Sequence, residues 1–550
     1  MKSKSLNQRA GLFLACFLFA SICFGQSWGP KVDELLSANY PSNGPGATAL
    51  VAKDGEVIYR KAFGMANLEL NVPMNPEHVF EIGSITKQFT AVSILMLQEQ
   101  GKLNFQDEIT KFIPDYPTQG KKITIHHLLT HTSGIKSYTS MDLDGIARTD
   151  MAPTELIDFF KSEPMDFDPG TQYLYNNSAY VILGYIIEIL SGETYPDFIE
   201  KNIFQKIGMN SSHYGSMTKL IKNRATGYSG DSERGYSNAD YLSLTLPYAA
   251  GSLMSSVDDM LKWQEAINDN VFVSRGSIEK AFTNYTLNDG TPLNYGYGWS
   301  INAISKVPVV EHGGGIFGYT TQGVYVPSED IYVIVLTNSD GNSPTSVTMQ
   351  MAAIAIGKPF PTESDAVSLT EKQLSKWVGA YEFENEAVRY ISLENGQLES
   401  QRGEGRSFKI FPSSENEFFF EDGSIDYVFS EVNGKKQAAF TNGMNVAIGK
   451  EVNKQKPADK VAVEVNPSIL KTYIGKYELE QGFVLEMSVL DNKLQVKAPG
   501  EDIAELFAES DSSFFMKAAP VSIQFHSDGT GKVTSLTLNQ GGQKMEGKRI

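Results

Sequence analysis

Three short sequence patterns follow one another in the first two thirds of the chain. They are Ser84-Ile85-Thr86-Lys87, Tyr175-Asn176-Asn177 and His312-Gly313-Gly314-Gly315. Together they supply a hydroxyl nucleophile, two groups that can take its proton, and a glycine-rich strand that can bind an oxyanion. These are the residue types that acyl transfer through a serine ester requires. The patterns therefore indicate a serine hydrolase.

The Ser-x-x-Lys pattern alone is weak, because this chain contains it five times, starting at Ser84, Ser133, Ser216, Ser277 and Ser468. Only Ser84 opens a long apolar stretch, residues 84–100, which is typical of a buried helix. Three residues are about one helical turn, so Lys87 returns to the face of Ser84, and the helix N-terminus favours negative charge there. We expect Ser84 to be the nucleophile and a desolvated, neutral Lys87 to accept its proton. The alternative, a capping serine with a surface lysine, is poor because this helix has almost no polar face.

The Tyr-x-Asn pattern occurs twice, at Tyr175 and at Tyr236. Tyr175 lies between a Pro169-Gly170 turn and an apolar helix predicted over residues 179–190, so its position is held by regular structure. Tyr236 lies in a polar stretch, which is typical of a surface loop. We therefore assign the second pattern to Tyr175. A packed tyrosine followed by a capping asparagine is the alternative.

The residues of this second pattern have specific expected roles. Tyr175, near a lysine, is expected to have a lowered pKa and to act as base for Ser84 or as acid for the leaving group. Asn177 is expected to donate to a substrate carbonyl while accepting a hydrogen bond from Lys87.

The glycine-rich pattern follows a short apolar run, residues 307–310. Pro308 cannot donate to a strand ladder, so a strand here is expected at a sheet edge or after the proline. Glycine permits close backbone approach, and Gly314 and Gly315 are expected to line the oxyanion site, with the N–H groups of Gly315 and Ser84 as donors. His312 is expected to orient a substrate carboxylate or the leaving group, or to shuttle protons. A glycine-rich turn is the alternative.

Three nearby histidines, His126, His127 and His131, raise the question of a metal site. Leu128 stands where a zinc protease needs glutamate, and no third ligand cluster is evident. We interpret these histidines as structural and expect neither a metal nor a cofactor.

The N-terminus has the pattern of a secretory signal. Lys2, Lys4 and Arg9 precede an apolar run over residues 10–24 that is too short to span a membrane. Small residues favour cleavage after Gly25, and a lipoprotein signal ending at Cys23 is the weaker alternative.

The composition narrows the class of protein further. Both cysteines lie in this leader, so the mature chain has no disulfides and no thiol chemistry. The formal charge of −18 argues against nucleic acid or an anionic membrane as partner.

The C-terminal third contains an internal repeat. Trp377-Val378-Gly379-Ala380-Tyr381 matches Tyr473-Ile474-Gly475-Lys476-Tyr477 at an offset of 96, and Phe418-Phe419 matches Phe514-Phe515 at the same offset. Short alternating strands with Gly, Asn and Asp turns predict a small antiparallel barrel in each copy. In the first two thirds, Asp54-Gly55 and a turn near Asp330 predict two hairpins in an α/β unit.

These residues resemble the penicillin-recognising serine hydrolases: class C β-lactamases, D,D-peptidases, D-aminopeptidases and family VIII esterases. The resemblance extends to Phe80-Glu81-Ile82-Gly83, to residues 127–134 (HLLTHTSG) and to Tyr295-Gly296-Tyr297-Gly298-Trp299. It implies an α/β (α+β) β-lactamase-like domain, with a five-stranded antiparallel sheet flanked by helices, and site roles like those above. Class C β-lactamases usually carry Lys-Thr-Gly where this chain has His312-Gly313-Gly314, so β-lactam hydrolysis is not expected as the main task. The two repeats are similar to the barrel pair of D-aminopeptidases, which implies a barrel loop in the cleft.

The expected organisation follows the chain from end to end. It is a signal peptide (1–25), a β-lactamase-like hydrolase domain (26–357), a linker (358–369), a first barrel (370–453), a linker (454–463) and a second barrel (464–550).

The sequence thus predicts an exported enzyme, periplasmic or secreted, that forms an acyl-enzyme at Ser84. Its expected substrate is a small D-amino-acid peptide or amide, with no nucleic-acid partner and no stable membrane insertion. An esterase of small acyl esters, a β-lactamase and a catalytically silent cell-wall-peptide binding protein are the alternatives. The oligomeric state is not indicated by the sequence.

Overall fold

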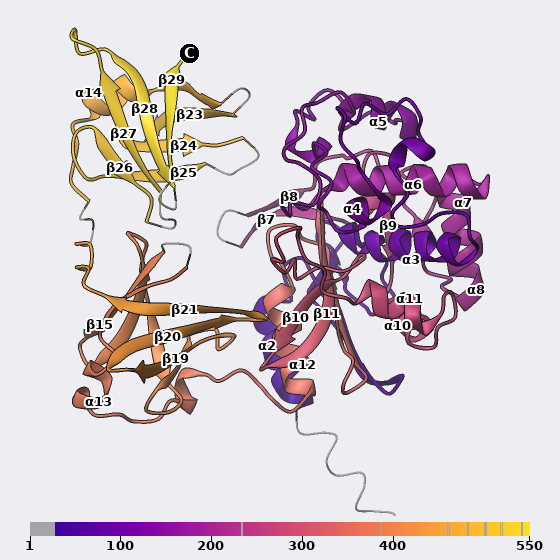
Figure 1. Ribbon diagram of the computed structural model, residues 1–550, viewed down its shortest axis with the longest axis horizontal. Coiled ribbons are helices and arrows are strands. Elements are labelled where there is room, and N and C mark those ends of the chain that lie inside the picture. Colours follow the sequence, from indigo (N-terminus) through magenta and orange to yellow (C-terminus); the bar gives the residue numbers. More distant parts are fainter. Residues whose placement is uncertain are drawn as a thin grey trace, which may run out of the picture. The chain divides into compact units, whose positions relative to one another are not determined.

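The computed structural model describes residues 28–550 apart from residues 233–234, 385–386, 459, 461, 481–482, 500–502, 518, 520 and 541–542. The predicted signal peptide, residues 1–25, lies outside the described residues. Among the helices within the described ranges, none is long and apolar enough to cross a bilayer. The described residues form two compact units, one ending at Phe360 and the other running from Pro361 to Ile550, which are considered in turn (Figure 1).

An antiparallel sheet of six strands forms the centre of the first unit, one strand more than the resemblance implied. Its spatial order is β10-β11-β12-β13-β1-β2. The strands are β1 (Ala47–Lys53), β2 (Glu56–Phe63), β10 (Ser300–Ile304), β11 (Val307–Ile316), β12 (Tyr319–Val326) and β13 (Ile331–Thr337). Because β1 pairs with β13, the two ends of the unit meet in one sheet.

Both predicted hairpins are confirmed. Asp54 and Gly55 join β1 to β2 with φ of 51° and 75°, the left-handed conformation that a primed two-residue turn requires. Asp330, with φ of 45°, lies in the turn between β12 and β13.

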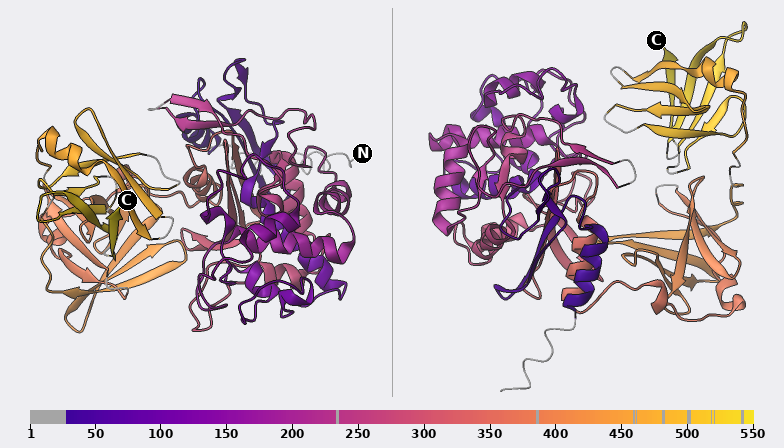
Figure 2. Two further views of the ribbon diagram at one scale, coloured as in Figure 1. Left: turned by 90° about the horizontal axis from the view of Figure 1, so that it is seen from above. Right: turned by 180° about the vertical axis from the view of Figure 1, so that it is seen from behind.

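Helices cover both faces of this sheet. On β1, Ala49 and Val51 belong to one core, while Leu50 and Ala52 belong to another, as strand alternation requires. The first core is completed by α2 (Gly29–Asn39) and α12 (Thr345–Ala355), which lie side by side in Figure 2, right, as an indigo and an orange helix. The second core contains the larger helical part of the unit.

That larger part is built around two long buried helices, α3 (Thr86–Glu99) and α6 (Asn177–Ser191). Around them lie α4 (Ile125–Leu129), α5 (Pro153–Phe160), α7 (Tyr195–Ile199), α8 (Gln205–Ile207), α9 (Tyr248–Gly251), α10 (Val257–Asn268) and α11 (Arg275–Ala281). Short strands complete it: β3 (Met65–Asn67), β4 (Val72–Pro73), β5 (Phe80–Glu81), β6 (His213–Tyr214), β7 (Tyr228–Asp231), β8 (Gly235–Asn238) and β9 (Leu253–Ser255).

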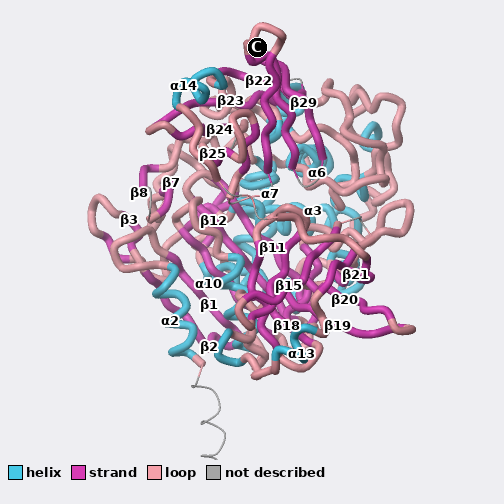
Figure 3. Tube along the Cα trace, turned by 90° about the vertical axis from the view of Figure 1, so that its left-hand side faces the viewer, coloured by secondary structure: helices cyan, strands magenta, loops and turns pink. Residues whose placement is uncertain are grey.

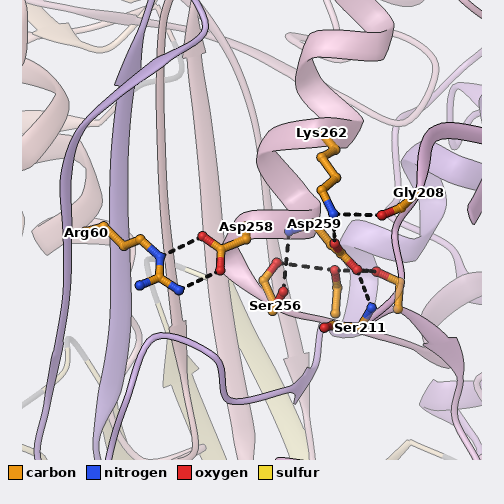
Figure 4. Close-up of polar contacts among 9 residues, drawn as sticks. Arg60, Gly208, Ser211, Ser256, Asp258, Asp259 and Lys262 are labelled. Carbon is orange, nitrogen blue, oxygen red and sulfur yellow. Dashed lines mark hydrogen bonds and ion pairs between the residues drawn. The ribbon is translucent and has the colours of Figure 1, made fainter.

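The start of α10 is tied to both layers by two adjacent carboxylates (Figure 4). Asp258 accepts two hydrogen bonds of 2.7 Å from the Arg60 guanidinium on β2. Asp259 is buried and accepts from the Ser211 N–H at 2.7 Å and from Lys262 at 2.8 Å. Ser256 caps the helix by accepting from the Asp259 N–H. These contacts fasten the helical part to the sheet.

The second unit consists of two closed antiparallel barrels of eight strands each. The first contains β14 (Gly379–Glu382), β15 (Val388–Glu394), β16 (Gln397–Arg402), β17 (Ser407–Pro412), β18 (Glu417–Phe420), β19 (Ile425–Val432), β20 (Lys435–Asn442) and β21 (Asn445–Val452). The second contains β22 (Gly475–Glu480), β23 (Phe483–Leu490), β24 (Lys493–Lys497), β25 (Ala504–Ala508), β26 (Ser513–Phe515), β27 (Val521–Ser527), β28 (Val533–Gln540) and β29 (Gln543–Arg549). In Figure 3, strands in magenta dominate both barrels.

The two barrels repeat one another in detail. A short helix precedes the first strand of each, α13 (Glu371–Ser375) and α14 (Pro467–Leu470). The Tyr381 hydroxyl donates to the Trp377 carbonyl at 2.8 Å, and Tyr477 donates to Tyr473 in the same way at 3.0 Å. The predicted repeat of small barrels is therefore confirmed.

Candidate active site

Ser84 lies at the entrance to the buried helix α3. It is half-buried in the single 3-10 turn η1 (Gly83–Ile85), which runs directly into α3. Lys87 is one turn further on, and its Nζ lies 3.0 Å from the Ser84 Oγ. The spacing expected from the Ser-x-x-Lys pattern therefore brings the hydroxyl and the amine together.

Lys87 is completely buried, and its surroundings favour the neutral amine. Burial lowers the pKa of Lys87 well below its usual value. The amine donates hydrogen bonds of 2.8 Å to the Asn177 Oδ1 and to the Ala250 carbonyl, both of which can only accept. A neutral amine has two N–H groups, so these two acceptors use both and leave its lone pair for the Ser84 hydroxyl.

Tyr175 lies over this pair, with its ring centroid 4.7 Å from the Lys87 Nζ. Burial raises the pKa of Tyr175 well above its usual value, and only a smaller opposing effect comes from the Ser84 hydroxyl. This is opposite to the lowered pKa expected from the sequence, because the loss of water outweighs a neighbouring amine that is itself neutral. Tyr175 therefore holds its proton and is suited to act as an acid.

Asn177 is the first residue of α6 and links that helix to the site. Its Oδ1 accepts from Lys87, as expected, and its Nδ2 donates to the Thr139 Oγ1 at 3.1 Å. Asn176, the N-cap of α6, accepts from the Ala179 N–H and so fixes where the helix begins.

His312 lies in the site, but its ring is held by the protein. Its Nδ1–H donates to the Gly313 carbonyl at 2.6 Å, and its Nε2 accepts from the Tyr295 hydroxyl at 2.9 Å. Burial lowers the pKa of His312 to about 3, so the ring is neutral. The expected direct contact of His312 with a substrate would break one of these bonds, because both ring nitrogens are engaged.

The glycines after His312 approach the nucleophile closely. β11 is not the edge strand that Pro308 suggested, since β10 pairs with it from Val307 to Glu311. In the described part of the chain, β11 pairs with both neighbouring strands up to Glu311 and with β12 alone beyond it, where Gly314 and Gly315 lie. A Cβ at Gly83 would lie 2.8 Å from the Gly315 N, which leaves no room for any residue but glycine. The backbone directly before Ser84 therefore lies against Gly315, next to the two N–H groups that the sequence analysis expects as oxyanion donors.

The site contains residues to which the sequence analysis gave no role. Tyr180 faces the Lys87 amine at 5.5 Å, and Tyr295 binds His312. His131, interpreted as structural, packs on the Tyr175 ring at 4.3 Å between centroids. Two of these residues lie in stretches that the sequence does single out: His131 in HLLTHTSG and Tyr295 in Tyr-Gly-Tyr-Gly-Trp. Those stretches were used only for the family resemblance, and no role in the site was inferred from them.

The other two histidines lie elsewhere in the fold. His126 bonds the Tyr297 hydroxyl at 2.8 Å, and His127 accepts from the Thr124 N–H at the start of α4. In the part of the chain that the structure describes, no group of three or more His, Cys, Asp or Glu side chains has the arrangement of a metal site. The tyrosine of the other Tyr-x-Asn pattern, Tyr236, is exposed on β8, as its polar surroundings in the sequence predicted.

Comparison with known proteins assigns the chain to a family. The family model described as Beta-lactamase matches residues 38–357, and one described as a domain of unknown function (DUF3471) matches residues 459–549. Penicillin-binding protein 4* of Bacillus subtilis is 30% identical over 423 residues, which cover 72% of this chain and 92% of that protein. A D-aminopeptidase of Gluconobacter oxydans is 28% identical over 340 residues, 60% of this chain and 62% of that protein.

Solved structures agree with this assignment. The octameric penicillin-binding protein homologue from Pyrococcus abyssi is 28% identical, with a TM-score of 0.55 over 85% of this chain and 97% of that one. A D-amino acid amidase from Ochrobactrum anthropi shares the fold, with a TM-score of 0.53 at 23% identity over 60% of this chain and 99% of that one. The chain therefore belongs to the β-lactamase family of serine hydrolases.

Proposed function

We propose that this protein is an exported hydrolase that forms an acyl-enzyme at Ser84 and cleaves small amides or peptides of D-amino acids. The observation that carries the proposal is the buried Lys87 Nζ, which lies 3.0 Å from the Ser84 Oγ and 2.8 Å from two further oxygen acceptors. Burial lowers its pKa well below the usual value. Such an amine is a base in contact with its nucleophile.

In the proposed acylation, the Ser84 proton moves to Lys87 while Oγ attacks the substrate carbonyl carbon. The oxyanion of the tetrahedral intermediate is bound by the N–H groups of Ser84 and Gly315. As the carbon–nitrogen bond breaks, Tyr175 gives its proton to the leaving amine and regains one from the Lys87 ammonium. A water molecule then attacks the ester by the same route in reverse, with Lys87 as base.

The proposed substrate class rests on the relatives rather than on the site alone. The named D-aminopeptidase and D-amino acid amidase indicate D-aminoacyl groups, although the former matches over less than two thirds of its length. His312-Gly313-Gly314, where class C β-lactamases usually carry Lys-Thr-Gly, favours a peptidase or esterase over a β-lactamase. An esterase and a catalytically silent binding protein remain the alternative functions, and the experiment below distinguishes them from a peptidase.

Export is proposed from the sequence of residues 1–25, with cleavage after Gly25, into the periplasm or the medium. In the same way we propose the linkers 358–369 and 454–463 as the boundaries of the hydrolase domain and the two barrels.

Intact mass spectrometry tests the function directly. The protein is incubated separately with benzylpenicillin, D-alanine amide and a D-alanine ester, and both the adduct and the released product are measured. We expect a transient adduct with the amide and ester, turnover of both, and a long-lived penicillin adduct. Ser84→Ala should abolish every adduct, whereas Ser216→Ala, in another Ser-x-x-Lys pattern, should retain them. An adduct that persists in Ser84→Ala would refute the nucleophile, and turnover of the ester alone would make the protein an esterase.

A further inference from the structure

One buried histidine holds the residue proposed as the catalytic acid from both sides. The carbonyl of His131 accepts from the Leu174 N–H at 3.1 Å, and its Nδ1 accepts from the Asn176 N–H at 3.0 Å. These two donors flank Tyr175 in the chain. The His131 ring also packs on the Tyr175 ring, with centroids 4.3 Å apart and planes 36° apart. His131 thus restrains the backbone and the ring of Tyr175 together.

The protonation state of His131 follows from these contacts. Nδ1 accepts from a backbone N–H, so the ring proton is on Nε2. Burial lowers the pKa of His131 well below its usual value, so the ring remains neutral and Nδ1 remains an acceptor. Within the described residues, the Nε2 of His131 has no hydrogen-bond partner. Either ring nitrogen of His131 could therefore carry its function, the bonded Nδ1 or the Nε2, and variants can tell the two apart.

His131 also belongs to a wider connection between two segments. The Thr132 carbonyl accepts from the Gly170 N–H, and the Gly134 carbonyl accepts from the Asp166 N–H, both at 2.8 Å. The Ile135 carbonyl accepts from the Asn176 side chain. These bonds hold the loop that carries Tyr175, and His131 accepts from the backbone N–H groups of both residues directly next to it.

The backbone at His131 limits what can replace it. Its φ of 59° is left-handed, a conformation that costs most residues energy and that glycine and asparagine tolerate best. Because the ring is fully buried, a side chain here has no access to solvent.

We propose that His131 is a positioning residue for Tyr175, and that its Nδ1 holds the Tyr175 hydroxyl where it can protonate the leaving group. This inference rests on the proposed function of Tyr175. A displaced acid matters most when the leaving group needs a proton: the amine of an anilide needs one, whereas p-nitrophenolate leaves without one.

The test therefore uses the full-length protein with D-alanine p-nitroanilide and D-alanine p-nitrophenyl ester. Both substrates form the same D-alanyl-enzyme, so the ratio of their kcat/KM values compares only the steps up to departure of the leaving group and reports the acid step. Loss of folded protein alone does not change that ratio. A second readout is independent of activity. In protein labelled with 3-fluorotyrosine, the ¹⁹F resonance of Tyr175 is the one that is absent from Tyr175→Phe.

Three variants at one position separate the possible roles. His131→Gly suits the backbone but removes the acceptor, and should lower the anilide-to-ester ratio about 10²-fold and shift or broaden the Tyr175 resonance. His131→Asn suits the backbone and places Oδ1 near the position of Nδ1, and should keep the ratio within about tenfold of wild type and the resonance sharp. His131→Gln carries its polar atoms where Nε2 lies and should resemble His131→Gly. His126→Ala, a half-buried histidine that also contacts tyrosines, is the matched control and should change neither readout.

Each outcome decides the proposal. A normal ratio and resonance in His131→Gly would overturn it, and so would rescue by Gln but not Asn, which would assign the role to Nε2. Combining His131→Gly with Tyr175→Phe should be no worse than Tyr175→Phe alone, and an additive loss would mean that His131 acts elsewhere. If the wild-type protein hydrolysed neither substrate, the proposed function would fail, while the ¹⁹F resonance would still decide the place of His131.

Discussion

Replacing Lys87 with methionine tests the base at the centre of the proposed mechanism. Methionine keeps most of the side-chain volume and removes only the amine. A lysine with an ordinary pKa is neutral in about one molecule in 10³ near neutral pH. Burial against neutral oxygens removes that limitation, because the pKa of Lys87 lies well below its usual value. We therefore expect Lys87→Met to slow acylation of Ser84 by about 10²- to 10⁴-fold.

The pH dependence follows from the same shift. Below the folded pKa of Lys87 the ammonium has a third N–H directed at Ser84 and cannot accept a proton, so the acylation rate should fall about tenfold per pH unit. Above that pKa the rate should be flat, because the pKa of Tyr175 is raised and it keeps its proton. The unfolded chain binds more protons than the folded one between the folded pKa of Lys87 and its unfolded value. The free energy of unfolding should therefore rise with pH in that window, and Lys87→Met should abolish this contribution.

The assay is the second-order rate of labelling by a fluorescent fluorophosphonate, measured from about pH 5 to about pH 10 so that it spans the range in which Lys87 titrates. Lys219→Met, which changes an exposed lysine in another Ser-x-x-Lys pattern, is the control and should label like wild type. Labelling of Lys87→Met within about threefold of wild type would refute the base assignment, since general base catalysis contributes far more. A wild-type rate that climbs up to the highest pH would show an ordinary, solvated lysine.

Three further predictions concern the acid, the oxyanion site and the barrels. Tyr175→Phe should cut amide turnover by about 10²- to 10⁴-fold, and adding Lys87→Met should make it little worse in steady-state assays, because the two act on one proton path; additive losses would imply separate roles. Gly314→Ala places a Cβ 2.1 Å from the Ile82 carbonyl oxygen and should lower kcat by about 10²-fold or more. The control Gly276→Ala, whose Cβ meets open space, should not change kcat. If Gly314→Ala had the kcat of wild type, β11 would be free to shift. A chain ending at Phe360 contains every residue of the site and should still be labelled at Ser84. If a barrel loop enters the cleft, the truncated chain should accept larger acyl groups, and unchanged selectivity would exclude that role.

Much of the fold followed from local sequence patterns. Asp54-Gly55 predicted the first hairpin because its turn needs two left-handed residues, which these residues tolerate. The offset of 96 predicted two similar barrels because several sequence matches share that register, and paired positions such as Tyr381 and Tyr477 make the same hydrogen bond in each copy. The strand order was not predictable, since it depends on contacts between distant segments, such as β1 with β13.

The sequence by itself determined that Ser84 and Lys87 share a helix face, because their spacing is about one turn. It also determined that glycine-rich backbone follows His312. Only the tertiary structure decided the protonation states, since burial by residues far apart in the sequence lowers the pKa of Lys87 and raises that of Tyr175. The tertiary structure likewise decided that the Tyr295 hydroxyl hydrogen-bonds the Nε2 of His312, and that His131 accepts from the N–H groups of both neighbours of Tyr175. Spacing is a property of the local chain, whereas desolvation and hydrogen-bond partners depend on the whole fold.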